Sequence, residues 1–130
     1  MTPQELMAKA QRALTSAKLL LDSGDVDGAC NRAYYAMFDA ARAALLSIHA
    51  PVPAEVARTH SGLITAFSLH LVKPGLVAVE HGRSLNKVED LRLIADYRGD
   101  PVTLENAAWA LEQAQSFLQA VQALQDKGLT

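Results

Sequence analysis

One stretch of this chain gathers residue types that can hold a phosphate group. Two arginines, a tyrosine and an aspartate follow one another at offsets of three, seven and ten: Arg32, Tyr35, Asp39 and Arg42. At about 100° per residue, these offsets place the four side chains on one narrow stripe of an α-helix. Arginine can grip a phosphodiester with two hydrogen bonds, and tyrosine can stack on a base. The stripe therefore indicates a site for an anion or an interface.

The aspartate and the first arginine also suit a reaction. RNA cleavage by its own 2′-hydroxyl needs a proton acceptor and a cation but no metal, and Asp39 and Arg32 supply both types of group. They stand about 10 Å apart along the helix axis, which leaves space for a ligand or for a side chain of a second subunit. A purely structural role stays open, because Asp39 can pair with Tyr35 or Arg42 along the helix. Arg32 can likewise pair with a distant carboxylate such as Asp96.

Other kinds of site find little support in the sequence. It contains no glycine-rich phosphate loop and no dinucleotide-binding motif, and no serine lies in a nucleophile elbow. The four histidines are far apart, at positions 49, 60, 70 and 81. Cys30 is the single cysteine, and we expect a small buried side chain there. No metal and no cofactor are therefore expected.

Two further segments carry polar side chains of interest. His60 stands in Arg58-Thr59-His60-Ser61-Gly62, close to an expected helix start, where anions are favoured. An ordinary helix cap explains the threonine and the serine equally well. Asp96-Tyr97-Arg98, at the end of a later helix, is expected to form a buried, hydrogen-bonded corner.

The composition favours an all-α fold. Half of the 130 residues are hydrophobic, alanine and leucine dominate, and β-branched residues are sparse. Apolar residues recur at helical spacing along most of the chain. We expect one domain, residues 1–130, folded as an up-and-down bundle of about five helices with short connections.

Start and stop signals place these helices. Thr2-Pro3-Gln4-Glu5 reads as a capping box, and Gly24 suits the end of the first helix. The second helix, at about 26–49, carries the stripe and an inner face of alanines. The expected ranges of the remaining helices are 61–72, 77–97 and, after a cap at Thr103, 104–128, with a turn at 98–101.

Charge and hydropathy limit the partners. The net charge is −2 and no polybasic tract occurs, so non-specific binding to duplex DNA is not expected. Residues 31–98 nevertheless hold eight Lys and Arg against six Asp and Glu, which makes the middle of the chain the place for a polyanion. No apolar run approaches the ~18 residues of a membrane span, and no signal peptide precedes the first helix. We expect a cytoplasmic protein.

The segment Asn31-Arg-Ala-Tyr-Tyr-Ala-Met-Phe-Asp-Ala-Ala-Arg-Ala43 resembles the HEPN superfamily, in particular its compact single-domain prokaryotic members. Thr59-His60-Ser61-Gly62-Leu63-Ile64, the leucine-rich segment that ends in Ala95-Asp96-Tyr97, and the amphipathic last helix agree with this resemblance. It covers nearly the whole chain in order.

The resemblance implies a helical bundle that forms a homodimer, and in many members a metal-independent ribonuclease. Some members are toxins beside a minimal nucleotidyltransferase, and others only bind. Active members share an arginine and a histidine with four to six residues between them, which two protomers bring together in a cleft. Here Arg32 matches the arginine, but Asp39 occupies the histidine position. Asp39 lacks the charge switch of histidine and adds negative charge where RNA would bind.

Three hypotheses follow. The first is a HEPN-like homodimer of a toxin–antitoxin or defence-type system that binds RNA or a nucleotide, with reduced catalysis. Its candidate catalytic residues are Arg32 and Asp39, and its candidate binding residues are Asn31, Tyr35, Arg42 and His60. The second is an active metal-independent endoribonuclease that uses Asp39 or His60. The third is a non-catalytic protein-interaction module. A minimal nucleotidyltransferase is a candidate partner in the first case.

Overall fold

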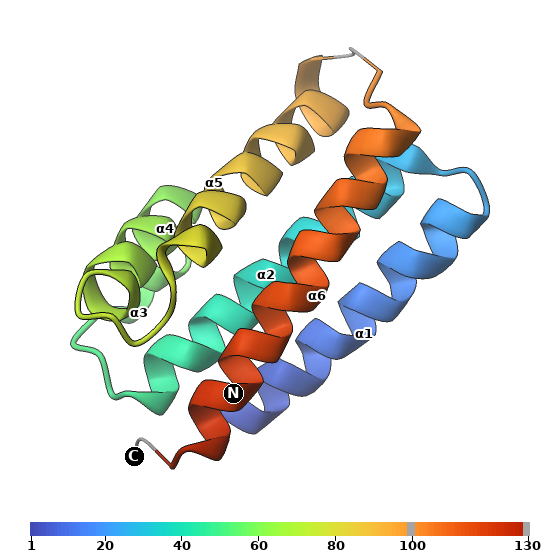
Figure 1. Ribbon diagram of the computed structural model, residues 1–130. Helices are drawn as coiled ribbons and strands as arrows, with labels where there is room; N and C mark the ends of the chain where they lie inside the picture. The colour runs from blue at the N-terminus through green and yellow to red at the C-terminus, as the bar shows by residue number, and fades with distance from the viewer. Residues whose placement is uncertain (99–100, 129–130) are drawn as a thin grey trace.

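The computed structural model describes residues 1–98 and 101–128, which form a bundle of α-helices (Figure 1). Four long helices make up the bundle, with two short ones at one end. In chain order they are α1 (Pro3–Asp22), α2 (Val26–Ser47), α3 (Ala54–Ala57), α4 (His60–Phe67), α5 (Val79–Leu93) and α6 (Leu104–Asp126). The all-α prediction is confirmed.

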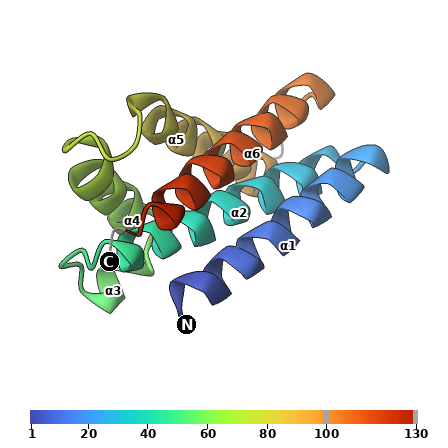
Figure 2. The ribbon, with the colours of Figure 1, turned by 60° about the horizontal axis from the view of Figure 1, so that its bottom comes forward.

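Helix α2 is the central element of the bundle. It contacts α1, α4, α5 and α6, and its contact with α1 is the most extensive in the molecule. Figures 1 and 2 show α2 enclosed between α1, α5 and α6. Fourteen of its 22 residues are buried, seven of them alanines. Because alanine adds little bulk, the neighbouring helices can approach the α2 backbone closely.

The helix starts follow the capping signals in the sequence. The Thr2 hydroxyl accepts a hydrogen bond from the Glu5 backbone, and the Glu5 carboxylate accepts one from Thr2 in return. Asp25 caps α2 by accepting from the Gly28 amide at 2.9 Å, and Thr103 caps α6 in the same way. Each cap satisfies amide donors that a helix leaves unpaired at its start.

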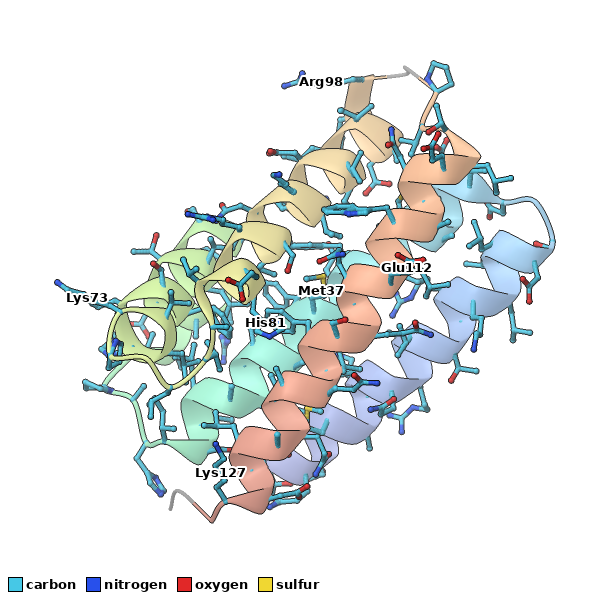
Figure 3. All side chains as sticks on the ribbon, in the orientation of Figure 1. Met37, Lys73, His81, Arg98, Glu112 and Lys127 are labelled. Atoms are coloured by element: carbon cyan, nitrogen blue, oxygen red, sulfur yellow. The ribbon has the colours of Figure 1, made fainter. Side chains whose placement is uncertain are left out.

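The core joins α4 and α5 to α6 through aromatic contacts. The rings of Phe67 and Phe117 stack at 5.0 Å, and His81 meets Phe117 edge-on at 6.1 Å. Figure 3 shows Met37 and His81 inside the bundle, whereas Lys73 and Arg98 project from its edges. His81 is half-buried, and this burial lowers the pKa of its imidazole, which favours the neutral form.

The predicted helix ranges differ from the structure in places. The described residues contain a short extra helix, α3, and α2 ends at Ser47, where His49 adopts a positive φ of 54°. Two predicted helices end in a wider π-helical turn, over Ser68–Val72 after α4 and over Ile94–Arg98 after α5. The α5 helix begins at Val79 rather than at 77. The predicted turn at 98–101 lies partly outside the described residues.

Asp96-Tyr97-Arg98 does not form the buried corner that we predicted. All three residues are exposed, and the Tyr97 ring is 74% exposed. The widened π-helical turn carries them to the edge of the bundle, although the Asp96 carboxylate still reaches α2.

Membrane insertion finds no support in this part of the chain. None of the helices in residues 1–98 and 101–128 is both long enough and apolar enough to cross a bilayer.

The close packing around α2 can be tested by overfilling it. Ala40 is fully buried on α2, so Ala40→Leu must push neighbouring side chains aside. We expect a loss of about 1–3 kcal/mol in the free energy of unfolding, measured by urea denaturation. The matched control is Ala8→Leu on the exposed side of α1, which should change stability by less than about 0.5 kcal/mol. Equal effects of the two substitutions would contradict the tight packing.

Candidate functional site

The predicted stripe is the one side of α2 that the described chain leaves uncovered. From Cys30 to Ser47, every residue of α2 is buried except five: Asn31, Arg32, Tyr35, Arg42 and Leu46. At 100° per residue these five share one side of the helix, and Asp39 falls among them. We call these six residues the open face of α2. The other sides of α2 are buried, and this side presents two arginines, a tyrosine and an asparagine to the surface.

Asp39 lies within the open face but is itself 3% exposed. Its Oδ1 is 4.0 Å from Nη1 of Arg42, the one counter-ion recorded within 4 Å in the described chain. Burial raises the pKa of Asp39, and the positive charges of Lys9, Arg42 and Arg32 oppose that rise. Asp39 is therefore a poorly solvated carboxylate with cations close to it.

A second polar cluster adjoins the open face where α2 meets α5. The Arg92 guanidinium is 3% exposed and donates to both carboxylate oxygens of Glu89, at 2.9 and 3.2 Å. It also donates to Oδ2 of Asp96 at 3.4 Å, and Asn31 donates to the same oxygen at 3.1 Å. The guanidinium lies 5.0 Å from the centre of the Tyr34 ring. This cluster ties the stripe helix to α5 and to the π-helical turn after it.

His60 links α4 to the same place. It is the first residue of α4, after the capping residue Thr59. Its Nδ1 lies 2.8 Å from the hydroxyl of buried Tyr34, and its ring is 6.0 Å from that of Tyr35. The guanidinium of Arg32 lies 5.8 Å from the centre of the Tyr35 ring. Arg32 and His60 therefore both contact Tyr35, although they come from different helices.

The structure thus separates the predicted site residues into two groups. Near the start of α2 it brings together four of them: Asn31, Arg32, Tyr35 and His60. Asp39 and Arg42 form a second group, farther along the same helix. Of the structural pairings considered for the stripe, Asp39 with Arg42 is present. The carboxylate of Asp96 is bound by Asn31 and Arg92 instead of Arg32.

Sequence reasoning missed Arg92, Glu89, Tyr34 and Lys9. The position of Arg92 could have been noticed in the sequence, because it lies at helical spacing from the buried residues Leu85 and Val88. A charged residue in the register of a core stripe predicts a buried partner. Lys9 carried no such signal, since its proximity to Asp39 follows from how α1 packs on α2.

A cavity of about 300 Å³ lies at the far end of the open face. Its walls are mostly apolar and include Leu45, Leu46 and Val52, with Arg42 and Arg58 as the charged lining residues.

Metal and thiol chemistry find no support in residues 1–98 and 101–128. No three His, Cys, Asp or Glu side chains gather there as metal ligands. Cys30 is fully buried, and burial, with smaller contributions from Asp27 and Asp96, raises the pKa of its thiol to about 11. It stays protonated at neutral pH and is a small core side chain, as predicted.

Taken together, the fold and the site define an all-helical bundle whose central Arg-Ala-Tyr-Tyr-Ala-Met-Phe helix meets a buried arginine–carboxylate cluster. The sequence model of the HEPN domain matches residues 3–124, and the chain belongs to this family.

Relatives in other organisms match most of the chain. A UPF0332 protein of Gloeobacter violaceus is 36% identical and covers 92% of this chain and 94% of its own. A Methanocaldococcus jannaschii protein named "Putative toxin" is 33% identical over 91% of this chain and 84% of its own. A UPF0332 protein of Thermotoga maritima is 35% identical over 89% of this chain and 85% of its own. The chain is thus a member of the HEPN family and is similar to a protein named as a putative toxin.

Removing Arg92 should destabilise the bundle. Arg92→Met leaves Glu89 without its partner in a poorly hydrated place, so we expect a loss of about 3–5 kcal/mol in the free energy of unfolding. The double variant Arg92→Met/Glu89→Leu removes both charges and should recover part of that loss. Arg83→Met, at an exposed position of α5, is the control. A single variant as stable as the control would contradict a structural role for the cluster.

The buried carboxylate of Asp39 should make stability depend on pH. Its pKa is raised in the folded state, so the folded protein binds more protons than the unfolded one between the two pKa values. Asp39 therefore stabilises the fold at low pH, and this contribution is lost as pH rises through the folded pKa. Asp39→Asn should be more stable than the wild type at pH 7, and the gain should shrink towards about pH 4. Thermal unfolding at several pH values measures this, with exposed Asp90→Asn as control.

Proposed function

We propose that this toxin-like HEPN protein binds the phosphates of single-stranded RNA or of a nucleotide with the open face of α2. One observation carries the proposal. The central helix is buried on every other side, and the side left uncovered presents Arg32, Tyr35 and Arg42. A helix that serves packing alone has no need of half-buried arginines on its exposed stripe. Arginine and tyrosine are the residue types that grip phosphates and stack on bases.

The charge around the open face supports an anionic ligand. Arg32 and Arg42 lie on it, and Lys9 of α1 is close enough to affect the Asp39 carboxylate. Arg58 lines the cavity at its far end together with Arg42. Asp39 is the single carboxylate among the six residues of the face, and it is buried. The six residues of the face therefore carry two positive charges against one buried negative charge, although the whole chain carries a net charge of −2.

A second copy of the chain is the proposed partner across this face. The family resemblance implies a homodimer with its cleft at the interface, and the open face is the uncovered side of the central helix. Leu46, which is 46% exposed, adds apolar area that a second subunit would cover. In a two-fold dimer both copies contribute the same patch, so two Arg32 side chains would line one cleft. A minimal nucleotidyltransferase is the proposed protein partner in the cell.

The burial of Asp39 favours binding over cleavage. A general base must come within hydrogen-bond reach of the proton that it takes. Asp39 is 3% exposed and has the cation of Arg42 beside it, so it is badly placed to accept the proton of a ribose hydroxyl. We therefore assign Asp39 to holding the arginines of the open face rather than to acid–base chemistry.

Binding can be measured by fluorescence anisotropy with a labelled single-stranded RNA oligonucleotide and, separately, with a labelled nucleoside monophosphate. Arg32→Ala should weaken RNA binding about tenfold, because one charge-assisted contact is worth about 1.5–3 kcal/mol. It should also lower the salt dependence of binding by about one phosphate contact. The matched control, Arg83→Ala on the exposed side of α5, should leave the affinity unchanged.

Several outcomes would contradict the proposal. Equal affinities of Arg32→Ala and Arg83→Ala, in variants shown to be folded, would mean that the open face does not hold RNA. If Arg32→Ala instead changed only the oligomeric state by light scattering, the interaction-module hypothesis would replace it. RNA cleavage in EDTA that Asp39→Asn abolishes would establish the ribonuclease hypothesis.

A further inference from the structure

The hydroxyl of Tyr34 needs a hydrogen-bond acceptor inside the bundle. Tyr34 is fully buried, and within the described residues the hydrogen-bond partner of its hydroxyl is Nδ1 of His60, at 2.8 Å. Burial, followed by the nearby Glu89 charge, raises the pKa of Tyr34, so the hydroxyl keeps its proton. A buried hydroxyl that donates to nothing is costly, and such groups are almost always paired.

Glu89 is the competing acceptor, since its charge and hydrogen bonding also act on the Tyr34 hydroxyl. The guanidinium of Arg92 donates to Oε2 of Glu89 at 2.9 and 3.2 Å and to Oε1 at 3.2 Å. Both carboxylate oxygens are thus engaged by a charged donor. Among the described residues, the recorded hydrogen bond of the Tyr34 hydroxyl is the one with this imidazole nitrogen, at 2.8 Å, so we assign the Tyr34 proton to it.

The direction of this hydrogen bond fixes the protons of His60. If Nδ1 accepts, neutral imidazole must carry its proton on Nε2, since one ring nitrogen donates and the other accepts. Nε2 can then donate a hydrogen bond to a ligand but cannot accept a proton from one. A donor suits a phosphate oxygen, whereas the 2′-hydroxyl chemistry of cleavage would need an acceptor.

The neighbours of His60 suit an anion. His60 is half-buried and contacts the ring of Tyr35, which also contacts Arg32. It is also the first residue of α4, where the helix dipole and the free backbone amides favour negative charge. Arg32 and the imidazole thus adjoin the same ring at one end of the open face.

We propose that His60 donates its Nε2 proton to a phosphodiester oxygen beside Arg32, and that Tyr34 is the positioning residue that fixes this tautomer. The phosphate ligand rests on the proposed function above. The tautomer stands independently of it, because it follows from the contacts of Tyr34 alone.

The tautomer can be read directly by long-range ¹H–¹⁵N NMR on the whole protein at about pH 8, where ordinary imidazole is neutral. The wild type should show a protonated Nε2 and an unprotonated Nδ1 for His60. Tyr34→Phe keeps the ring, removes the hydroxyl and should give a mixture of tautomers. The control is Tyr97→Phe, which also removes a tyrosine hydroxyl beside Arg92 but at a 74% exposed position. It should leave the His60 signals unchanged.

Binding of the same labelled RNA oligonucleotide tests the donor role. His60→Ala should weaken binding about tenfold, and Tyr34→Phe should weaken it several-fold. His60→Gln should restore most of the affinity, because the glutamine amide presents a donor near the place of Nε2. His60→Asn, whose amide is too short to reach that place, should not restore it.

Each result bears on a different part of the proposal. A protonated Nδ1 in the wild type, or a tautomer that Tyr34→Phe leaves unchanged, overturns the role of Tyr34. Full affinity in His60→Ala overturns the donor role of His60. If the wild type binds no RNA while the NMR result holds, the proposed function fails and the tautomer assignment survives.

Discussion

The close approach of neighbouring helices to α2 is the constraint on which the rest of the structure depends. Seven buried alanines on this helix leave room for α1 and α6 to pack near its backbone. Larger residues occupy most of the other buried positions of α2. Among them, the rings of Tyr34 and Phe38 contact the ring of His60 in α4. One side of the helix is then left over. The polar residues of the open face can occupy it without disturbing the core, so packing determines where a site is available.

Arg92 connects α2 to α5 and to the π-helical turn after α5. Its guanidinium lies against the Tyr34 ring of α2, and its carboxylate partners come from α5 and from the π-helical turn after it. Asn31 closes the connection from α2 to Asp96. Because the Arg92 guanidinium is buried, its hydrogen bonds lie in surroundings less polar than water, so their loss costs more than it would on the surface. The surroundings of His60 beside Tyr35 therefore depend on contacts between α2 and α5 as well as on α4 itself.

Local signals made most of the fold predictable from sequence. The caps at Thr2, Asp25 and Thr103 depend on residues within three positions, and the helical spacing of apolar residues is equally local. The widened turns at Ser68–Val72 and Ile94–Arg98 left no such signal. The candidate site was partly predictable, since Arg32, Tyr35 and Asp39 share one helix. The burial of Asp39 and its proximity to Lys9 depend on how α1 packs, which no spacing within α2 reveals.

The packing of α2 also limits what its signature can tell about relatives. In Arg-Ala-Tyr-Tyr-Ala-Met-Phe, five of seven residues are buried, and Ala33, Tyr34, Ala36 and Met37 are fully inaccessible to solvent. Selection for a stable bundle alone would preserve these positions. A homologue could lose its ligand during evolution and still display most of the motif. If the proposed binding role holds, its inheritance is better traced through Arg32, Tyr35 and His60, which are only partly buried.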